Sequence, residues 1–173
     1  RKYKKGQIIF FEGDPGEAVY FVKEGKIKIY KSDPEGREYI LHIFGPGNIF
    51  AETVLLGGDP YPANAEAVED SVVGVIKNSD LEKLLKKNTD IAFKIIKVLS
   101  KRLRDSQENI KNLVFRDTYD RTACALHKMS LEHGIKTPQG IEVEMPITRS
   151  ELASIVGTSR ETVTRMLSEM KRK

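Results

Sequence analysis

The hydrophobic pattern of the chain changes its period near residue 77. Up to that point, short β-branched and aromatic runs alternate with glycine and proline turns, such as GDPG at 13–16 and DPEG at 33–36. Short strands with turn signals at this spacing predict a β-sandwich or barrel. Beyond residue 77, apolar residues recur three and four positions apart, which indicates helices. We therefore expect an α+β fold in which strands come first and helices follow.

Local signals place the expected elements along the chain. Strands are expected at 7–11, 18–22, 26–30, 39–44, 49–50, 63–68 and 71–76. Helices are expected at 80–88, at 90–115, and from a cap at Asp117 to about His133, where Gly134 ends the helix. Alternating apolar residues at 141–145 predict an edge strand. Cys124 is expected to be a small core residue in an apolar stripe with Ala123, Leu126 and Met129.

The expected helix at 90–115 has apolar side chains at alternating spacings of four and three residues. This heptad seam consists of Ala92, Ile96, Leu99, Leu103, Ser106, Ile110 and Leu113. Such a seam needs a partner that buries it. Additional apolar residues in the first half predict that this half packs on its own β-domain; they are Ile91, Phe93, Ile95 and Val98. We expect the second half to pair with a second copy in a homodimer; packing of the whole helix on its own chain is the alternative.

Residues 148–171 read as two short helices joined by a tight turn. Two capping boxes are expected, Thr148-x-x-Glu151 and Thr158-x-x-Glu161, with Gly157 ending the first helix in a left-handed conformation. The expected core faces of the two helices are formed by Leu152, Ile155 and Val156, and by Val163, Leu167 and Met170. The spacing predicts a helix-turn-helix.

The exposed side of the second helix carries chemistry that suits base recognition. An arginine fork matches the O6 and N7 atoms of guanine, and a glutamate accepts from the N4 amine of cytosine. The residues expected on this side, near the start of the helix, are Arg160, Glu161, Thr164 and Arg165. The alternative is an ordinary surface helix with a Glu–Arg bridge. The formal net charge of +4 suits nucleic acid without requiring it.

The order of elements and their residues resemble the cyclic AMP receptor / fumarate-nitrate regulator (CRP/FNR) family of bacterial transcription factors. The most specific segment is IVGTSRETVTR at 155–165, and GD at 13–14, VYFVKEG at 19–25 and GNIFAE at 47–52 also match. The resemblance covers nearly the whole chain. It implies a β-roll (jelly-roll) sensor domain at 1–88, a dimerisation helix and hinge at 89–116, and a DNA-binding domain at 117–173.

The resemblance also implies partners and DNA contacts. Arg160, Glu161 and Arg165 would read bases in the major groove, and the positions that would contact phosphates are Thr148, Arg149, Ser159 and Thr162. A homodimer would recognise a pseudo-palindromic site in double-stranded DNA and would act with RNA polymerase in the cytoplasm. Family members usually continue into a β wing after the recognition helix, and this chain stops at Lys173.

The effector positions depart from the cyclic AMP pattern. By resemblance, the effector-binding residues are Glu52, Tyr61, Arg102, Ser106 and Gln107. The positions of the family's phosphate-gripping Arg-Ser pair hold Tyr61 and Pro62. A buried phosphate needs a paired cation or a set of donors. Tyr61 and Pro62 bring no charge, so cyclic AMP binding in the standard manner is not expected.

The small numbers of cysteines and histidines limit which cofactors and which enzymatic activities are expected. One cysteine, Cys124, cannot hold an iron–sulfur cluster. Haem stays open, although structural or surface roles are favoured for His42, His127 and His133. The alternative function is a cupin-like β-barrel that binds or transforms small molecules, but 1–77 hold only His42 and cupin metal sites use several histidines. A regulator without a ligand also stays open. No membrane span, signal peptide or catalytic motif is recognised, so neither an enzyme nor a membrane partner is expected.

Overall fold

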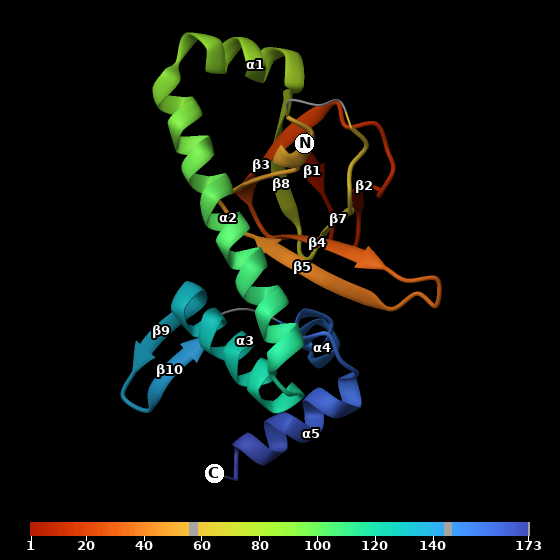
Figure 1. The fold of residues 1–173 in the computed structure, drawn as a ribbon, viewed down its shortest axis with the longest axis vertical. Coiled ribbons are helices and arrows are strands. Elements are labelled where there is room, and N and C mark those ends of the chain that lie inside the picture. The colour runs from red at the N-terminus through yellow and green to blue at the C-terminus, as the bar shows by residue number, and fades with distance from the viewer. Residues whose placement is uncertain (56–58, 144–146, 173) are drawn as a thin grey trace. The chain divides into compact units, whose positions relative to one another are not determined.

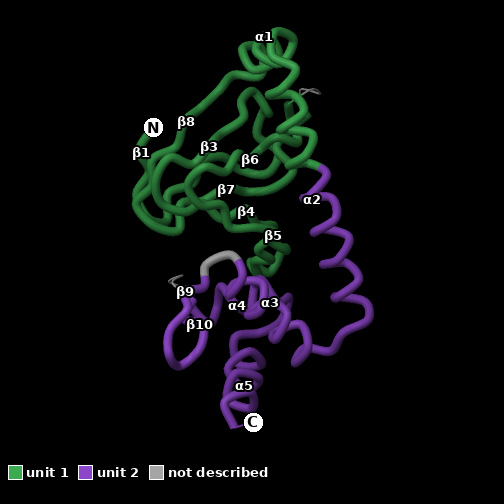
Figure 2. The backbone as a smooth tube through the Cα atoms, turned by 90° about the vertical axis from the view of Figure 1, so that its left-hand side faces the viewer, with its two compact units in different colours: residues 1–99 green, residues 100–173 purple. Residues whose placement is uncertain are grey.

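The computed structural model describes residues 1–55, 59–143 and 147–172. Contacts within the chain divide it into two compact units, Arg1–Leu99 and Ser100–Lys173 (Figure 2). The first unit contains all strands of the β-roll, and the second contains the hinge and the helix-turn-helix. The boundary falls inside one long helix.

Two four-stranded antiparallel sheets form the β-roll (Figure 1). The strand order is β1-β8-β3-β6 in one sheet and β2-β7-β4-β5 in the other. Their bounds are Lys2–Tyr3 for β1, Ile8–Phe10 for β2, Ala18–Glu24 for β3, Ile27–Ser32 for β4, Glu38–Phe44 for β5, Ile49–Phe50 for β6, Asn64–Ala67 for β7 and Ser71–Lys77 for β8. The expected strands and the α+β class are confirmed. The short strand β1, which pairs with β8, was not predicted.

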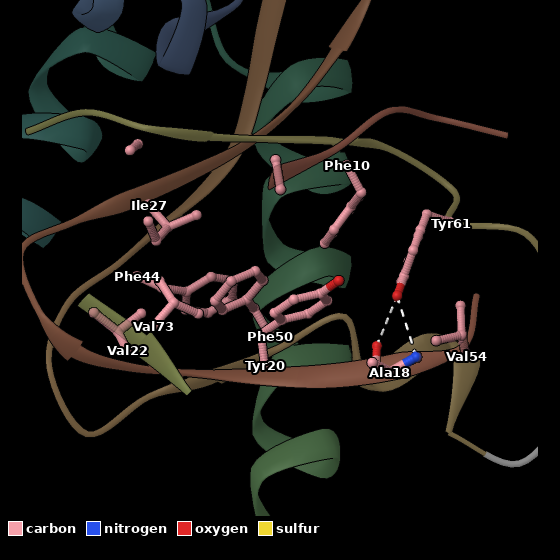
Figure 3. Packing of buried hydrophobic residues seen from close by; sticks show 12 residues of the cluster. Phe10, Ala18, Tyr20, Val22, Ile27, Phe44, Phe50, Val54, Tyr61 and Val73 are labelled. Atoms are coloured by element: carbon pink, nitrogen blue, oxygen red, sulfur yellow. Dashed lines mark hydrogen bonds between the residues drawn. The ribbon is translucent and has the colours of Figure 1, made fainter. Parts of the chain in front are cut away.

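Aromatic rings fill the space between the two sheets (Figure 3). Phe50 is fully buried, and its ring stacks on Tyr20 at 5.2 Å between centroids. The ring of Phe10 stacks on Tyr61 at 3.9 Å. Alternating side chains of β4 and β7, such as Ile27 and Ala65, close the core from the second sheet. Apolar residues at every second position of the strands therefore point inward, and the two sheets of one chain together bury them in a single core.

Two helices follow the β-roll, α1 (Asn78–Lys87) and α2 (Thr89–Phe115). Leu81 of α1 is buried with Val19 and Leu55, and Ile95 of α2 packs against this cluster. The first half of α2 thus packs on its own β-domain, as predicted. The prediction was wrong for Phe93, which is 69% exposed because it lies on the opposite side of the helix from Ile95, and for Val98, which is 37% exposed.

The heptad seam of α2 is exposed. None of the described residues of α2 is buried. The largest exposed fractions along the seam are 56% for Ile96, 62% for Leu103, 62% for Ile110 and 43% for Leu113. Among the helices that the structure describes, none has the length and apolar character needed to cross a bilayer.

The second unit packs three helices and a hairpin. After the second half of α2, its elements are α3 (Thr118–His133), β9 (Gly134–Thr137), β10 (Gly140–Val143), α4 (Arg149–Val156) and α5 (Arg160–Met170). The Asp117 carboxylate accepts from the N–H of Asp120 at 2.8 Å, so the predicted cap of α3 is confirmed. The expected edge strand is β10. Met145, which the prediction included, lies outside the described residues.

A compact apolar cluster holds α3, α4 and α5 together. Its buried members are Met129, Leu152, Ala153, Val156 and Val163, with Ile155 and Leu167 packed against them. Met166 is also buried and was not predicted to be. Ala123 is exposed and Cys124 is only half-buried, so the core role predicted for Cys124 and the place of Ala123 in the apolar stripe of α3 are both wrong. That stripe begins at Ala125 instead.

Candidate nucleic-acid interface

The first helix of the helix-turn-helix begins at a complete capping box. The Thr148 hydroxyl accepts from the N–H of Glu151 at 3.1 Å. The Glu151 carboxylate accepts from the N–H of Thr148 at 2.7 Å, and from its hydroxyl at the same distance. These reciprocal bonds satisfy backbone donors that the first turn of a helix leaves open. The box predicted at Thr148 and Glu151 is confirmed, and it fixes where α4 starts.

The turn between the helices has the predicted glycine, but the next cap is one residue later than predicted. Gly157 adopts φ 72° and ψ 52°, a left-handed conformation that suits glycine. The N–H groups of Gly157 and Thr158 both donate to the Ala153 carbonyl, at 2.9 and 3.0 Å. Because Thr158 is used in closing α4, Ser159 becomes the cap of α5 and accepts from the N–H of Thr162 at 3.2 Å. The predicted capping box of Thr158 and Glu161 is therefore wrong.

The hydroxyl groups along this interface have partners inside the chain. The Ser159 and Thr162 hydroxyl oxygens lie 3.1 Å apart, within hydrogen-bond distance. The Thr164 hydroxyl donates to the Arg160 carbonyl at 2.8 Å, one turn back along α5. A hydroxyl that donates internally can still accept, but it has no second proton for a phosphate. These side chains therefore fix the helices first, and their expected contacts with DNA stay predictions.

The charged side chains of the interface project from these fixed helices. Arg149 is exposed at the first position of α4, and Arg160, Glu161 and Arg165 are exposed on α5. The pKa of the Glu161 carboxyl is lowered, first by a hydrogen bond from its own backbone N–H and then by the Ser159 hydroxyl. Glu161 is thus an anion at neutral pH and a hydrogen-bond acceptor. The opposite side of α5 is fixed by the buried Val163.

Arg121 is a structural link that sequence reasoning missed. Its guanidinium donates from Nε to the Val156 carbonyl at 3.2 Å and from NH2 to the Gly157 carbonyl at 3.5 Å. It also donates from NH1 to the Arg116 carbonyl at 3.1 Å. These acceptors are 35, 36 and 5 residues away in sequence. No local pattern signals such a contact, because it depends on how α3 packs on α4.

Glu52, the expected effector residue of the β-roll, lies in a strained segment. It begins a short 3₁₀ turn, η1 (Glu52–Val54). The preceding Ala51 has φ 60° and ψ 25°, and it is the one non-glycine residue with positive φ in the described part of the chain. The Asn78 side chain fixes the other end of η1 by donating to the carbonyls of Val54 and Gly16, both at 2.8 Å. Strained backbone of this kind is characteristic of ligand and switch segments.

Tyr61, expected at the effector site, belongs to the core. It is 4% exposed and stacks on Phe10. Its hydroxyl donates to the Ala18 carbonyl at 2.9 Å and accepts from the Ala18 N–H at 3.2 Å (Figure 3). Burial in the same cluster raises the pKa of the Tyr20 hydroxyl far above its ordinary value. The structure thus gives Tyr61 a packing role in the core of the β-roll. Its expected contact with an effector stays a prediction.

The other expected effector residues lie on α2, in the second unit. Arg102 is half-buried, whereas Ser106 and Gln107 are exposed. Glu52 belongs to the first unit, so the expected set draws on both units and stays a prediction. The His42 ring packs against Phe44 at 4.2 Å. No group of three or more metal-binding side chains is arranged to hold a metal within the described residues.

Two family models match the chain. The cyclic nucleotide-binding domain matches residues 1–88, and the Crp-like helix-turn-helix domain matches residues 120–173. The chain is 35% identical to the cyclic AMP receptor protein of Thermus thermophilus over 96% of its own length and 74% of that relative. It is 30% identical to the CRP-like cAMP-activated global transcriptional regulator of Mycobacterium tuberculosis, covering 96% and 75%. Identity to the anaerobic regulatory protein of Bacillus subtilis is 31%, covering 100% and 73%.

Solved structures share the fold. FixK2 from Bradyrhizobium japonicum aligns with a TM-score of 0.86 at 28% identity, covering 99% of this chain and 83% of that one. A CooA mutant from Carboxydothermus hydrogenoformans aligns with a TM-score of 0.84 at 27% identity, covering 99% and 75%. The β-roll, the long helix and the helix-turn-helix thus occur together, in this order, in solved structures.

Proposed function

The chain belongs to the CRP/FNR family of DNA-binding transcription regulators, and from this premise we propose that it reads a pseudo-palindromic DNA site as a homodimer. The observation that supports this most directly is the geometry of α5. Its cap and its buried Val163 fix the helix, while Arg160, Glu161 and Arg165 remain exposed. A helix in this state can enter the major groove with its first two turns toward the base edges.

The remaining contacts in the proposal position the recognition helix on the backbone. Arg149 supplies a cation at the start of α4, where free backbone N–H groups also favour an anion. The other positions proposed to contact phosphates are Thr148, Ser159 and Thr162, whose hydroxyls would donate to the DNA in place of their present partners inside the chain. Thr164, which was expected on the exposed side of α5, is half-buried, and its hydroxyl would have to give up the Arg160 carbonyl to contact DNA. Phosphate contacts set the register of a protein on DNA but do not select a sequence.

The exposed seam on α2 supports the homodimer. Leu103 and Ile110 are both 62% exposed, and they lie seven residues apart on the same side of the helix. Two copies that pair along this seam place two α5 helices on one duplex, which accounts for a pseudo-palindromic site. In this proposal the chain acts in the cytoplasm together with RNA polymerase.

We also propose that an effector other than cyclic AMP controls the regulator. The proposed contacts are Glu52 in the strained η1 segment and Arg102, Ser106 and Gln107 on α2. The Tyr61 hydroxyl is bonded to the backbone of Ala18, and Pro62 has no N–H, so neither replaces the charge that a cyclic phosphate requires. An effector moves the two-state equilibrium of the DNA-binding domain only if it binds the two states with different affinities.

Arg165→Ala tests the reading of bases. We expect binding to an operator selected from a random duplex library to weaken by about 1–3 kcal/mol, because one bidentate contact to a base pair is lost. Titration of the operator and its single-base-pair variants by fluorescence anisotropy would show relaxed preference at one position per half-site.

Arg149→Ala is the matched control for that experiment. It removes the same charge from the neighbouring helix, so we expect an equal loss on every sequence and a salt dependence reduced by about one phosphate contact. An equal loss across all sequences for Arg165→Ala would show that Arg165 contacts phosphate and not a base.

A further inference from the structure

One arginine side chain on α3 donates to backbone carbonyls of two separate segments of the second unit. Arg121 lies in the first turns of α3, and its own N–H donates to the Asp117 carbonyl at 3.0 Å. Its guanidinium reaches the carbonyls of Arg116, Val156 and Gly157. Arg116 follows α2, and Gly157 precedes the cap of α5. A single rigid group therefore touches both the junction of α2 with α3 and the turn that leads into the recognition helix.

The chemistry of this contact is specific to arginine. The last carbonyls of a helix receive no hydrogen bond from within the helix, and they carry partial negative charge. A cation near the end of α4 is therefore favourable. A guanidinium has five N–H donors in a fixed planar fork, which allows it to serve acceptors on different segments at once. An ammonium at the same place supplies the charge, but it is a compact point that cannot span the same acceptors.

We propose that Arg121 is a positioning residue that couples the α2–α3 junction to the orientation of the recognition helix α5. The proposal rests on the function proposed above, because it assigns to Arg121 the alignment of Arg160 and Arg165 with base edges. Arg121 itself does not touch DNA in this proposal. It holds the Val156–Gly157 turn against the junction, so that a change at Arg116 moves the start of α5 in a defined direction.

A simpler role for Arg121 makes different predictions. If it only neutralises the end of α4, a lysine at this position should replace it. If it only stabilises the fold, its loss should weaken all DNA binding alike. The coupling role predicts instead that sequence discrimination falls while binding to non-specific duplex is retained, because charge on the DNA-facing side is unchanged.

The experiment compares Arg121→Gln, Arg121→Lys and the unaltered full chain on a selected operator and on a scrambled duplex of equal length. We expect Arg121→Gln to lose operator affinity about tenfold, as for the loss of charge-assisted hydrogen bonds, and to change scrambled-duplex affinity less than about twofold. Arg121→Lys should lose operator affinity nearly as strongly. Lys128→Gln, seven residues along the same helix, controls for the loss of one positive charge from α3 and should leave the ratio of the two affinities unchanged.

Three outcomes would overturn the proposal. One is full operator affinity in Arg121→Lys. Another is an equal loss of affinity on operator and scrambled duplex in Arg121→Gln.

The third comes from hydrogen exchange, which tests positioning without DNA. We expect faster exchange in Arg121→Gln at the amides of Gly157, Thr158 and Thr162, with the α3 amides unchanged, and uniform acceleration throughout residues 118–170 would contradict coupling. If the unaltered chain bound no DNA, the function proposed above would fail, and the exchange result would still decide the local role of Arg121.

Discussion

The β-roll core and the long helix α2 use apolar side chains in opposite ways. In the β-roll, Phe50 and Ile27 are completely buried, and the rings of Phe10, Tyr20 and Tyr61 pack around them. In α2, side chains of the same kind are exposed, including Leu103 and others along its heptad seam. An apolar surface of this extent on one helix is typical of an interaction site.

A single chain buries the core of the β-roll by itself, whereas the apolar seam of α2 is left for a partner to bury. Alternating residues from two sheets can close a core because both faces belong to the same chain. A heptad seam on a single helix is buried only when a second helix packs along it. The comparison therefore predicts that changes in the β-roll act on folding, whereas changes on α2 act on assembly and DNA binding.

Phe50→Ala should have the largest effect on folding. We expect the free energy of unfolding to fall by about 3–5 kcal/mol, because a buried ring is lost and the surrounding rings cannot fully collapse into the cavity. Chemical denaturation followed by circular dichroism measures this. Phe11→Ala is the matched control: this ring is 56% exposed, and its loss should cost less than about 1 kcal/mol. Equal losses of stability for the two variants would show that burial in the β-roll does not decide its folding stability.

Leu103→Ala should weaken dimer association and leave the folding stability of each chain nearly unchanged. We expect dimer association to weaken by about 3 kcal/mol, because symmetry removes the buried side chain from both copies. Sedimentation over a range of concentrations measures the dissociation constant. Leu131→Ala on α3, where the side chain is 73% exposed, is the control and should leave association unchanged. A large loss of folding stability in the Leu103 variant, with association intact, would show that the seam packs within one chain.

Ala51→Gly should have the smallest effect, and in the stabilising direction. The left-handed conformation of Ala51 costs about 1–2 kcal/mol relative to glycine, and the added freedom of the unfolded chain offsets about half of that. We expect the melting temperature to rise slightly, which differential scanning calorimetry resolves. Such a rise would show that the β-roll keeps a strained residue next to Glu52, although the rest of its core is well packed. A fall in melting temperature would mean that the alanine methyl group makes contacts worth more than the strain.

Elements that depend on local signals could be predicted from the sequence. The caps at Asp117 and Thr148 and the left-handed Gly157 follow from residues within four positions of each other, and the structure contains all three. The Ser159 cap was missed by one residue, because the pattern does not show that the Thr158 N–H closes the preceding helix. Two possible helix-start motifs that are offset by one residue are distinguished only by the geometry of the turn between the helices.

Features that depend on distant packing could not be predicted. The hydrogen bonds of Tyr61 join residues 43 positions apart, and the resemblance that suggested a ligand contact for Tyr61 gave no sign that its ring packs in the core. The bonds of Arg121 to the end of α4 also depend on packing that no periodicity reveals. The exposure of Glu161 and Arg165 could be predicted more readily, because helical spacing turns both residues away from the buried Val163.

On α5, the residue that caps the helix is separate from the residues proposed to read bases, and this separation affects how such regulators can diversify. The hydroxyl of Ser159 fixes the helix start, while separate charged residues, Arg160, Glu161 and Arg165, are available to read bases. Under the proposed contacts, a substitution at these charged positions would change operator preference while leaving the cap and the buried side of α5 untouched, so it would cost little folding stability. A duplicated gene could then acquire new operators through a few substitutions on this one helix.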